Sequence, residues 1–384
     1  MRGLLLLVAV GGYLQSSSAA PPAVLNSAAN PGAQGFTEAL APRVFVFPRD
    51  HGPHTDFRQE WWYLTGNLDA TDGQRFGFEL TFFRVALVPP PAQPAASSTV
   101  SAWRARQIYV AHFAVTDVAR RRFRSQQKLS REALGLAGAQ AAPLRVWLDD
   151  WSLELPPGGG AGAWKLHAAQ PGYAVDLMLE PLEAPVLNGV AGLSRKSEQA
   201  GDATYYYSIP HLQVRGRLVR EGQPLELRGL AWLDREWGSG GLGPREVGWD
   251  WFALQLNDGS ALMFYALRDR EGGRDAHSAG TFIAGDSGTR VLSNADLSIA
   301  VTDSWRNRNG ERYPAGWRIR VPAMALDLTV RPALADQELR TTPPYWEGAV
   351  DVTGERAGKS LGGRGYVELV GYAQDSAQDS AQER

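Results

Sequence analysis

The sequence predicts an all-β protein with two antiparallel β-barrel domains packed in tandem. Short runs in which apolar and polar residues alternate recur along the 384 residues, as they do in half-buried strands. Turns rich in Gly, Pro, Asn and Asp separate these runs, and helical periodicity is almost absent. A two-strand motif also occurs twice, which indicates two related domains of the barrel or sandwich class.

The repeated motif covers residues 60–84 and 248–268. Each copy has a Trp-rich start, an apolar strand, an Asp-Gly turn and an alternating strand, and it closes on Arg84 or Arg268. An Asn/Asp-Gly turn between alternating apolar runs is the strongest short hairpin signal. We therefore place the boundary near residues 238–248 and predict domains over residues 43–240 and 241–373. Only residues 131–142, rich in Ala and Leu, predict a short helix.

The two ends of the chain have different compositions. Residues 1–20 combine Arg2, an apolar run and the small residues Ser18, Ala19 and Ala20, which is the pattern of a secretory signal peptide. This apolar run is too short to span a membrane, so we expect a soluble protein in the periplasm or outside the cell. We expect residues 21–42 to form a flexible leader and residues 374–384 a disordered polar tail.

Charge and cysteine content exclude several classes of function. The chain has 39 Lys and Arg against 41 Asp and Glu, which argues against nucleic acid or an anionic membrane as the main partner. It has no cysteine, which excludes both a disulfide framework and a lipoprotein anchor.

Residues 231–252 are the most unusual stretch of the chain. Trp232, Asp234 and Glu236 are spaced by two and therefore share one face of a strand. Trp249 and Trp251 repeat this spacing after a Gly-rich turn. The cluster has two interpretations: an acid site lined by aromatic faces, or a barrel core closed by an ion pair.

Four separated stretches carry a family resemblance: DFRQEWWYLTGNL, YYYSIPHLQVRG, LAWLDREWGS with GWDWFALQLNDG, and YWEGAVDVTG. They resemble the AttH/carotenoid 1,2-hydratase family, over about residues 47–372. The resemblance implies two lipocalin-like (calycin) barrels. The family includes carotenoid hydratases, fungal hydratases and cyclases, and AttH proteins encoded beside ABC transport components. The essential aspartate of the carotenoid hydratases corresponds to Asp234, whereas Arg235 and Glu236 are closer to the AttH branch.

The chemistry of a hydratase explains why these residue types matter. Hydrating an alkene without a cofactor requires a protonated carboxyl, and burial or a like-charged neighbour raises a carboxyl pKa. Asp234 and Glu236 are therefore the candidate catalytic residues, with Asp234 as the acid. Aromatic faces stabilise a carbocation, and a barrel lumen suits an isoprenoid or acyl-chain ligand. The candidate substrate-binding residues are Trp62, Tyr206, Tyr207, His211, Trp232, Trp249 and Trp251.

Metal and serine chemistry have weaker support. His51, His54 and Asp56 are plausible zinc ligands, but Pro53 constrains their segment and no helical register brings them together. A rigid loop over the barrel mouth is favoured, and we expect no metal and no cofactor. Ser239 lacks the strand-to-helix elbow of a serine hydrolase.

Three functional hypotheses remain open. The protein is an enzyme that hydrates or isomerises an apolar, isoprenoid- or lipid-like substrate. Alternatively, it is a non-catalytic carrier of such a ligand, serving an ABC transport system. In the third hypothesis the barrels are filled by their own side chains, and Asp234 forms a structural ion pair with Arg84, Arg235 or Arg245.

Overall fold

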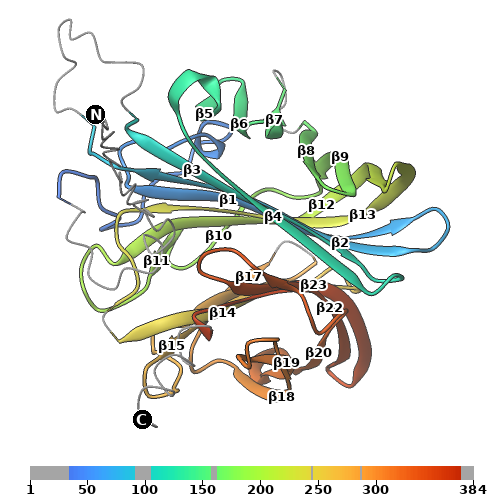
Figure 1. Ribbon diagram of the computed structural model, residues 1–384. Coiled ribbons are helices and arrows are strands. Elements are labelled where there is room, and N and C mark those ends of the chain that lie inside the picture. Colours follow the sequence, from blue (N-terminus) through green and yellow to red (C-terminus); the bar gives the residue numbers. More distant parts are fainter. Residues whose placement is uncertain (1–33, 91–104, 157–161, 244, 286–287, 373–384) are drawn as a thin grey trace, which may run out of the picture.

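The computed structural model describes residues 34–90, 105–156, 162–243, 245–285 and 288–372. This part of the chain is nearly all β, as the sequence predicts. It forms two antiparallel sheets, of 13 and 10 strands, that lie one above the other in Figure 1. Three short 3-10 turns accompany them: η1 (Arg49–His51), η2 (Ala133–Gly135) and η3 (Pro322–Met324).

The strands of the N-terminal sheet are β1 (Gln59–Ala70), β2 (Arg75–Ala86), β3 (Gln107–Asp117), β4 (Arg122–Arg131), β5 (Ala137–Ala141), β6 (Leu144–Leu148), β7 (Trp151–Leu155), β8 (Trp164–Gln170), β9 (Tyr173–Pro181), β10 (Val186–Leu187), β11 (Leu193–Arg195), β12 (Ala203–Arg220) and β13 (Gln223–Gly238). Those of the C-terminal sheet are β14 (Glu246–Leu256), β15 (Ala261–Asp269), β16 (Ala279–Ile283), β17 (Thr289–Ser293), β18 (Ser298–Arg306), β19 (Arg312–Val321), β20 (Leu326–Pro332), β21 (Glu338–Leu339), β22 (Tyr345–Arg356) and β23 (Lys359–Val370).

Both sheets have the same circular strand order. In each, the first strand pairs with the second and also with the last, so that β1 lies between β2 and β13 and β14 lies between β15 and β23. The outer strands of each sheet are consecutive in sequence: β4 and β5 in one, β17 and β18 in the other. Each sheet therefore curls into a nearly closed barrel.

Strand alternation gives each barrel a filled interior and gives the protein a third apolar cluster between the barrels. On β1, Trp62 and Leu64 point into the N-terminal core, whereas Tyr63 points to the seam between the barrels. On β14, Phe252 belongs to the C-terminal core, whereas Trp251 belongs to the seam. These strands are buried on both faces, and for this reason apolar residues occupy consecutive positions along them.

The arginines that close the sequence repeat have a structural role at one end of each barrel. Arg84 and Arg235 both bind the carboxylate of Glu60, and all three side chains are fully buried. Burial alone would raise the pKa of Glu60, but the two guanidinium groups hold it well below its usual range. In the C-terminal barrel, Arg268 Nε lies 3.4 Å from Asp250 Oδ1. The ion pairs that close the barrel ends thus use carboxylates other than Asp234.

The short helix expected over residues 131–142 is not formed, and that prediction was wrong. The segment contains η2 and then β5, which pairs with β6. Leu134 and Gly135 have φ angles of 59° and 70°, which break a helix, and Ala-rich residues then complete the edge of the sheet. Tertiary pairing overrides the helical propensity of alanine here.

The ends of the chain are described only in part. The predicted signal peptide and polar tail lie outside the described residues. The last residues of the predicted flexible leader already pack against the folded chain. Thr37 N–H donates a hydrogen bond to Asp56 O at 2.9 Å, and Ala39 is buried. Within the described ranges, no helix is long and apolar enough to cross a membrane.

Candidate active site

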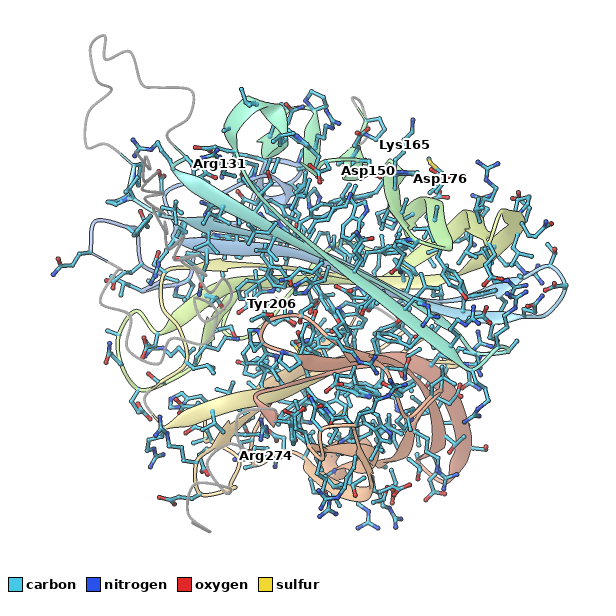
Figure 2. All side chains as sticks on the ribbon, in the orientation of Figure 1. Arg131, Asp150, Lys165, Asp176, Tyr206 and Arg274 are labelled. Carbon is cyan, nitrogen blue, oxygen red and sulfur yellow. The ribbon has the colours of Figure 1, made fainter. Side chains whose placement is uncertain are left out.

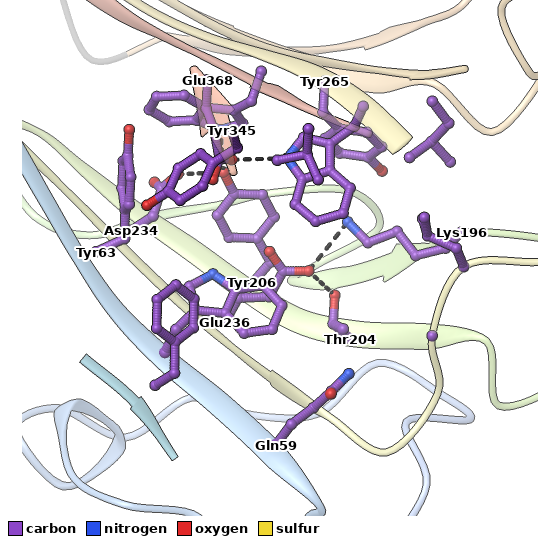
Figure 3. A pocket seen from close by; sticks show the side chains of 18 of the residues that line it. Gln59, Tyr63, Lys196, Thr204, Tyr206, Asp234, Glu236, Tyr265, Tyr345 and Glu368 are labelled. Carbon is purple, nitrogen blue, oxygen red and sulfur yellow. Dashed lines mark hydrogen bonds and ion pairs between the residues drawn. The ribbon is translucent and has the colours of Figure 1, made fainter. Parts of the chain in front are cut away.

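A cavity of about 160 Å³ lies in the seam between the two barrels, and not in either barrel lumen (Figure 3). Strands from both barrels line it, mainly with aromatic side chains and with three carboxyl groups. Its principal lining residues are Trp61, Tyr63, Phe83, His112, Lys196, Thr204, Tyr206, Asp234, Glu236, Leu242, Trp249, Trp251, Tyr265, Pro343, Tyr345 and Glu368.

Strand β13 brings Asp234 and Glu236 to this cavity by alternation. Leu233, Arg235 and Trp237 face the N-terminal barrel, so the alternate residues Asp234 and Glu236 face the opposite side. The two-residue spacing that predicted a shared face therefore holds, but that face is the seam and not a lumen.

Asp234 is the most strongly hydrogen-bonded carboxyl of the site. Only 3% of the residue is exposed. Its Oδ1 accepts hydrogen bonds from Ser208 Oγ at 2.5 Å and Trp232 Nε1 at 2.7 Å, and its Oδ2 accepts one from Tyr206 Oη at 2.5 Å. Burial raises the pKa of Asp234 to about 7, against the lowering effect of these three donors.

Glu236 has a different environment from Asp234. Its Oε1 lies 3.1 Å from Lys196 Nζ and also accepts a hydrogen bond from Thr204. Lys196 Nζ lies 3.9 Å from the centre of the Tyr265 ring. Burial tends to lower the pKa of Lys196, but the attraction of Glu236 raises it. Lys196 therefore stays charged, and Glu236 forms an ion pair inside the cavity.

Glu368 faces the cavity from β23 of the opposite barrel, and it is not among the site residues predicted from the sequence. Its Oε2 accepts a hydrogen bond from Trp249 Nε1 at 2.7 Å. Burial raises the pKa of Glu368 to about 7, and the charges of Asp234 and Glu236 act in the same direction. A signal was present in the sequence, because Glu368 interrupts the apolar run from Val367 to Leu369.

The predicted binding residues fall into two groups. Tyr206, Trp249 and Trp251 line the cavity, and Figure 2 shows Tyr206 between the two barrels. Trp232 packs in the seam and supports Asp234 through its indole N–H. The structure does not bring the other three to the cavity.

Those three residues have other partners. Trp62 lies in the N-terminal core, with the guanidinium of Arg235 3.8 Å above its ring. Tyr207 lies in the same core, with its hydroxyl 2.6 Å from His51 Nδ1. His211 Nδ1 lies 2.7 Å from Glu183 Oε1.

The histidine-rich segment before β1 closes one end of the N-terminal barrel. His54 stacks on Trp237 with a ring distance of 3.7 Å, whereas Asp56 is exposed. In the described part of the chain, no group of three or more His, Asp or Glu side chains is arranged to hold a metal ion.

The fold and the cavity define a protein of two lipocalin-like barrels with a buried acidic site between them. The chain belongs to the AttH-like family, whose sequence model matches residues 38–372.

Solved structures and a curated relative are similar to this chain. An AttH protein of Nitrosomonas europaea is 35% identical, with a TM-score of 0.75 over 87% of this chain and 100% of that one. Kievitone hydratase of Nectria haematococca shares the fold at 16% identity, with a TM-score of 0.65 over 87% of this chain and 95% of that one. The dehydratase asqC of Emericella nidulans is 24% identical over 225 residues, which are 54% of this chain and 60% of the relative.

Proposed function

We propose that this protein is a cofactor-independent hydratase or dehydratase, or an isomerase of the same acid chemistry, that acts on an apolar, isoprenoid- or lipid-like small molecule. One observation carries the proposal. A cavity lined mainly by aromatic and aliphatic side chains contains Asp234 and Glu368, two carboxyl groups that burial brings to a pKa of about 7.

Carboxyl groups of this kind suit proton transfer to and from carbon. A general acid works best when its pKa lies near the working pH, and an ordinary carboxyl is fully ionised at pH 7. A protonated carboxyl in the cavity can add a proton to an alkene, which leaves a carbocation at the more substituted carbon. The ring faces of Trp61, Trp249 and Trp251 can stabilise that cation.

The similar proteins support the same reaction class. Among them, kievitone hydratase is named a hydratase and asqC a dehydratase, and these reactions are the two directions of one equilibrium. An apolar substrate is proposed because the cavity lining is mainly aromatic and aliphatic.

Native mass spectrometry of protein purified from its own host tests the proposal first. We expect a co-purified apolar molecule that carries an alkene or a hydroxyl group. Finding no such molecule counts against an apolar ligand. A ligand with neither group rules out hydration and dehydration.

Isotope exchange then tests the chemistry. The ligand is incubated in H₂¹⁸O with the wild type and with Asp234→Asn, and ¹⁸O incorporation is followed by mass spectrometry. We expect exchange by the wild type and a loss of at least 100-fold in the variant, as is usual when a proton-transfer residue is removed. Tight binding with no exchange by the wild type indicates a carrier instead of an enzyme.

We also propose that the protein is exported, because residues 1–20 have the composition of a signal peptide. Fractionation of host cells, with N-terminal sequencing of the mature protein, tests this. A cytoplasmic protein that begins at Met1 contradicts it.

A further inference from the structure

Asp234 and Glu368 line the same cavity from opposite barrels, and the proposed reaction needs one proton donor and one proton acceptor (Figure 3). Both carboxyls are buried in this cavity, and the charge of Asp234 raises the pKa of Glu368, so ionising both is disfavoured and near neutral pH the pair holds one proton. The hydrogen-bond donors around each carboxyl determine which one keeps that proton.

Two hydrogen-bond donors contact Oδ1 of Asp234, the indole N–H of Trp232 and the hydroxyl of Ser208. The indole N–H of Trp232 can only donate. The lone pair of Ser208 Oγ accepts from Asn188 Nδ2 at 2.8 Å, and Asn188 Oδ1 in turn accepts from Thr281 Oγ1 at 2.8 Å. The chain from Thr281 through Asn188 therefore directs the hydroxyl hydrogen of Ser208 toward Asp234.

The second oxygen of Asp234 has a similar arrangement. Tyr206 Oη accepts a hydrogen bond from Trp251 Nε1 at 3.0 Å, and its own hydrogen points to Oδ2. Three hydrogens thus converge on this carboxyl, from Trp232, Ser208 and Tyr206. All of them stabilise the ionised form of Asp234.

Glu368 has much less support for a negative charge. It accepts one side-chain hydrogen bond, from Trp249, and it forms no ion pair with any residue that the structure describes. An ionised Asp234 also disfavours a second charge on Glu368. Within the pair, Glu368 is therefore the better site for the proton.

The other titratable groups near Asp234 and Glu368 do not change which of the two carboxyls keeps the proton. The charge of Glu236 is balanced by Lys196. Burial raises the pKa of Glu347 and of Glu79 far above the usual range, so both stay protonated. Burial also lowers the pKa of His112 to about 3, so its ring is neutral. The neighbouring phenols stay protonated because burial raises their pKa values: Tyr63, Tyr206, Tyr345 and Tyr366.

We propose that Glu368 is the proton donor of the site and that Asp234 is the carboxylate that activates water, the reverse of the role that the sequence assigned to Asp234. This inference rests on the proposed function. In hydration, the O–H bond of Glu368 breaks and its proton forms a new C–H bond on the alkene. Water then bonds to the cationic carbon and releases one proton to Asp234.

The cycle closes without a redox partner. After hydration Glu368 is ionised and Asp234 is protonated, and solvent returns the proton from Asp234 to Glu368. In dehydration the same groups act in reverse: protonated Asp234 gives its proton to the departing hydroxyl, and ionised Glu368 removes the proton from carbon. Asn188 and Thr281 are positioning residues, because they act through Ser208 and do not reach the cavity lining.

Infrared difference spectroscopy at pH 7 tests the location of the proton without any substrate. The wild type minus Glu368→Gln spectrum should show the loss of a protonated carboxyl C=O band. The wild type minus Asp234→Asn spectrum should show the loss of a carboxylate band. Glu236→Gln is the matched control and should also lose a carboxylate band. The opposite assignment of the first two bands overturns the proposal.

Ser208→Ala provides a second variant that removes a single hydroxyl. Loss of one hydrogen bond to a charged group should raise the pKa of Asp234 by about 1 to 2 pH units, which the protonated carboxyl band reports on titration. Asn67→Ala is its control, because Asn67 also donates across the seam, to Gly365 O at 3.0 Å, without a link to Asp234. If the pKa of Asp234 is the same in Ser208→Ala and in Asn67→Ala, the proposal is contradicted. The infrared bands can place the proton on Glu368 while no ligand exchanges oxygen in H₂¹⁸O. In that case the proposed hydratase function is wrong, but the location of the proton is still confirmed.

Discussion

Asp234→Asn should change the pH dependence of folding stability by an amount that follows from the burial of this carboxyl. The pKa of Asp234 is about 7 in the folded protein, against an ordinary value of 3.8. Between these values the folded state keeps a proton that the unfolded state has lost, so the contribution of Asp234 to stability falls as pH rises. A difference of about three pH units corresponds to about 4 kcal/mol, reached at pH 7 and above.

Urea denaturation followed by tryptophan fluorescence at pH values from 4 to 8 measures this effect. The free energy of unfolding of the wild type, minus that of Asp234→Asn, should fall by about 4 kcal/mol across the range. Taking the difference cancels the titration of groups that do not interact with Asp234, and the same difference measured in a Glu368→Gln background removes the carboxyl that does interact with it. Asp303→Asn, at an exposed position, is the control and should give a flat difference. A flat difference for Asp234 as well would refute the reasoning.

Three further outcomes follow from the same structure. Glu60→Gln leaves two buried arginines without their shared carboxylate and should destabilise the fold by about 3 to 5 kcal/mol in urea denaturation; an effect below 1 kcal/mol contradicts a buried network. The pH profile of turnover should be bell-shaped around pH 7, and Asp234→Asn and Glu368→Gln should each remove one limb; an unchanged profile in both excludes the pair. Tyr63→Phe removes the 2.6 Å hydrogen bond to Glu347 and should cost about 1 to 3 kcal/mol of stability, which thermal and urea unfolding will confirm or contradict.

The barrels were predictable because their signals are local. Alternation and Asp-Gly turns define a hairpin within about twenty residues, and the repeat of that hairpin indicated two domains. The short helix was a local prediction as well, and it failed where pairing of β5 with β6 outweighed the propensity of alanine.

The site was predictable only within one strand. The spacing of Asp234 and Glu236 placed them on one face, but no local signal tells whether that face points to a lumen or to a second barrel. Lys196 lies 40 positions before Glu236 in the sequence and Glu368 lies 132 positions after it, and only the packing of the barrels brings them to one cavity. Sequence spacing carries no information about such a contact.

The repeat explains why the seam contains matched carboxyls. On β13, Asp234 lies opposite Tyr63 of the first strand of its barrel, and on β23, Glu368 lies opposite Trp251 of the first strand of the other. Tyr63 and Trp251 occupy the same position in the two copies of the repeat, so Asp234 and Glu368 are equivalent residues of two copies of one unit. Their environments differ, because Asp234 accepts hydrogen bonds from three side chains whereas Glu368 accepts one, from the indole N–H of Trp249. The two equivalent carboxyls thus differ in how well their surroundings stabilise a negative charge, which is the difference that a proton donor and a proton acceptor require.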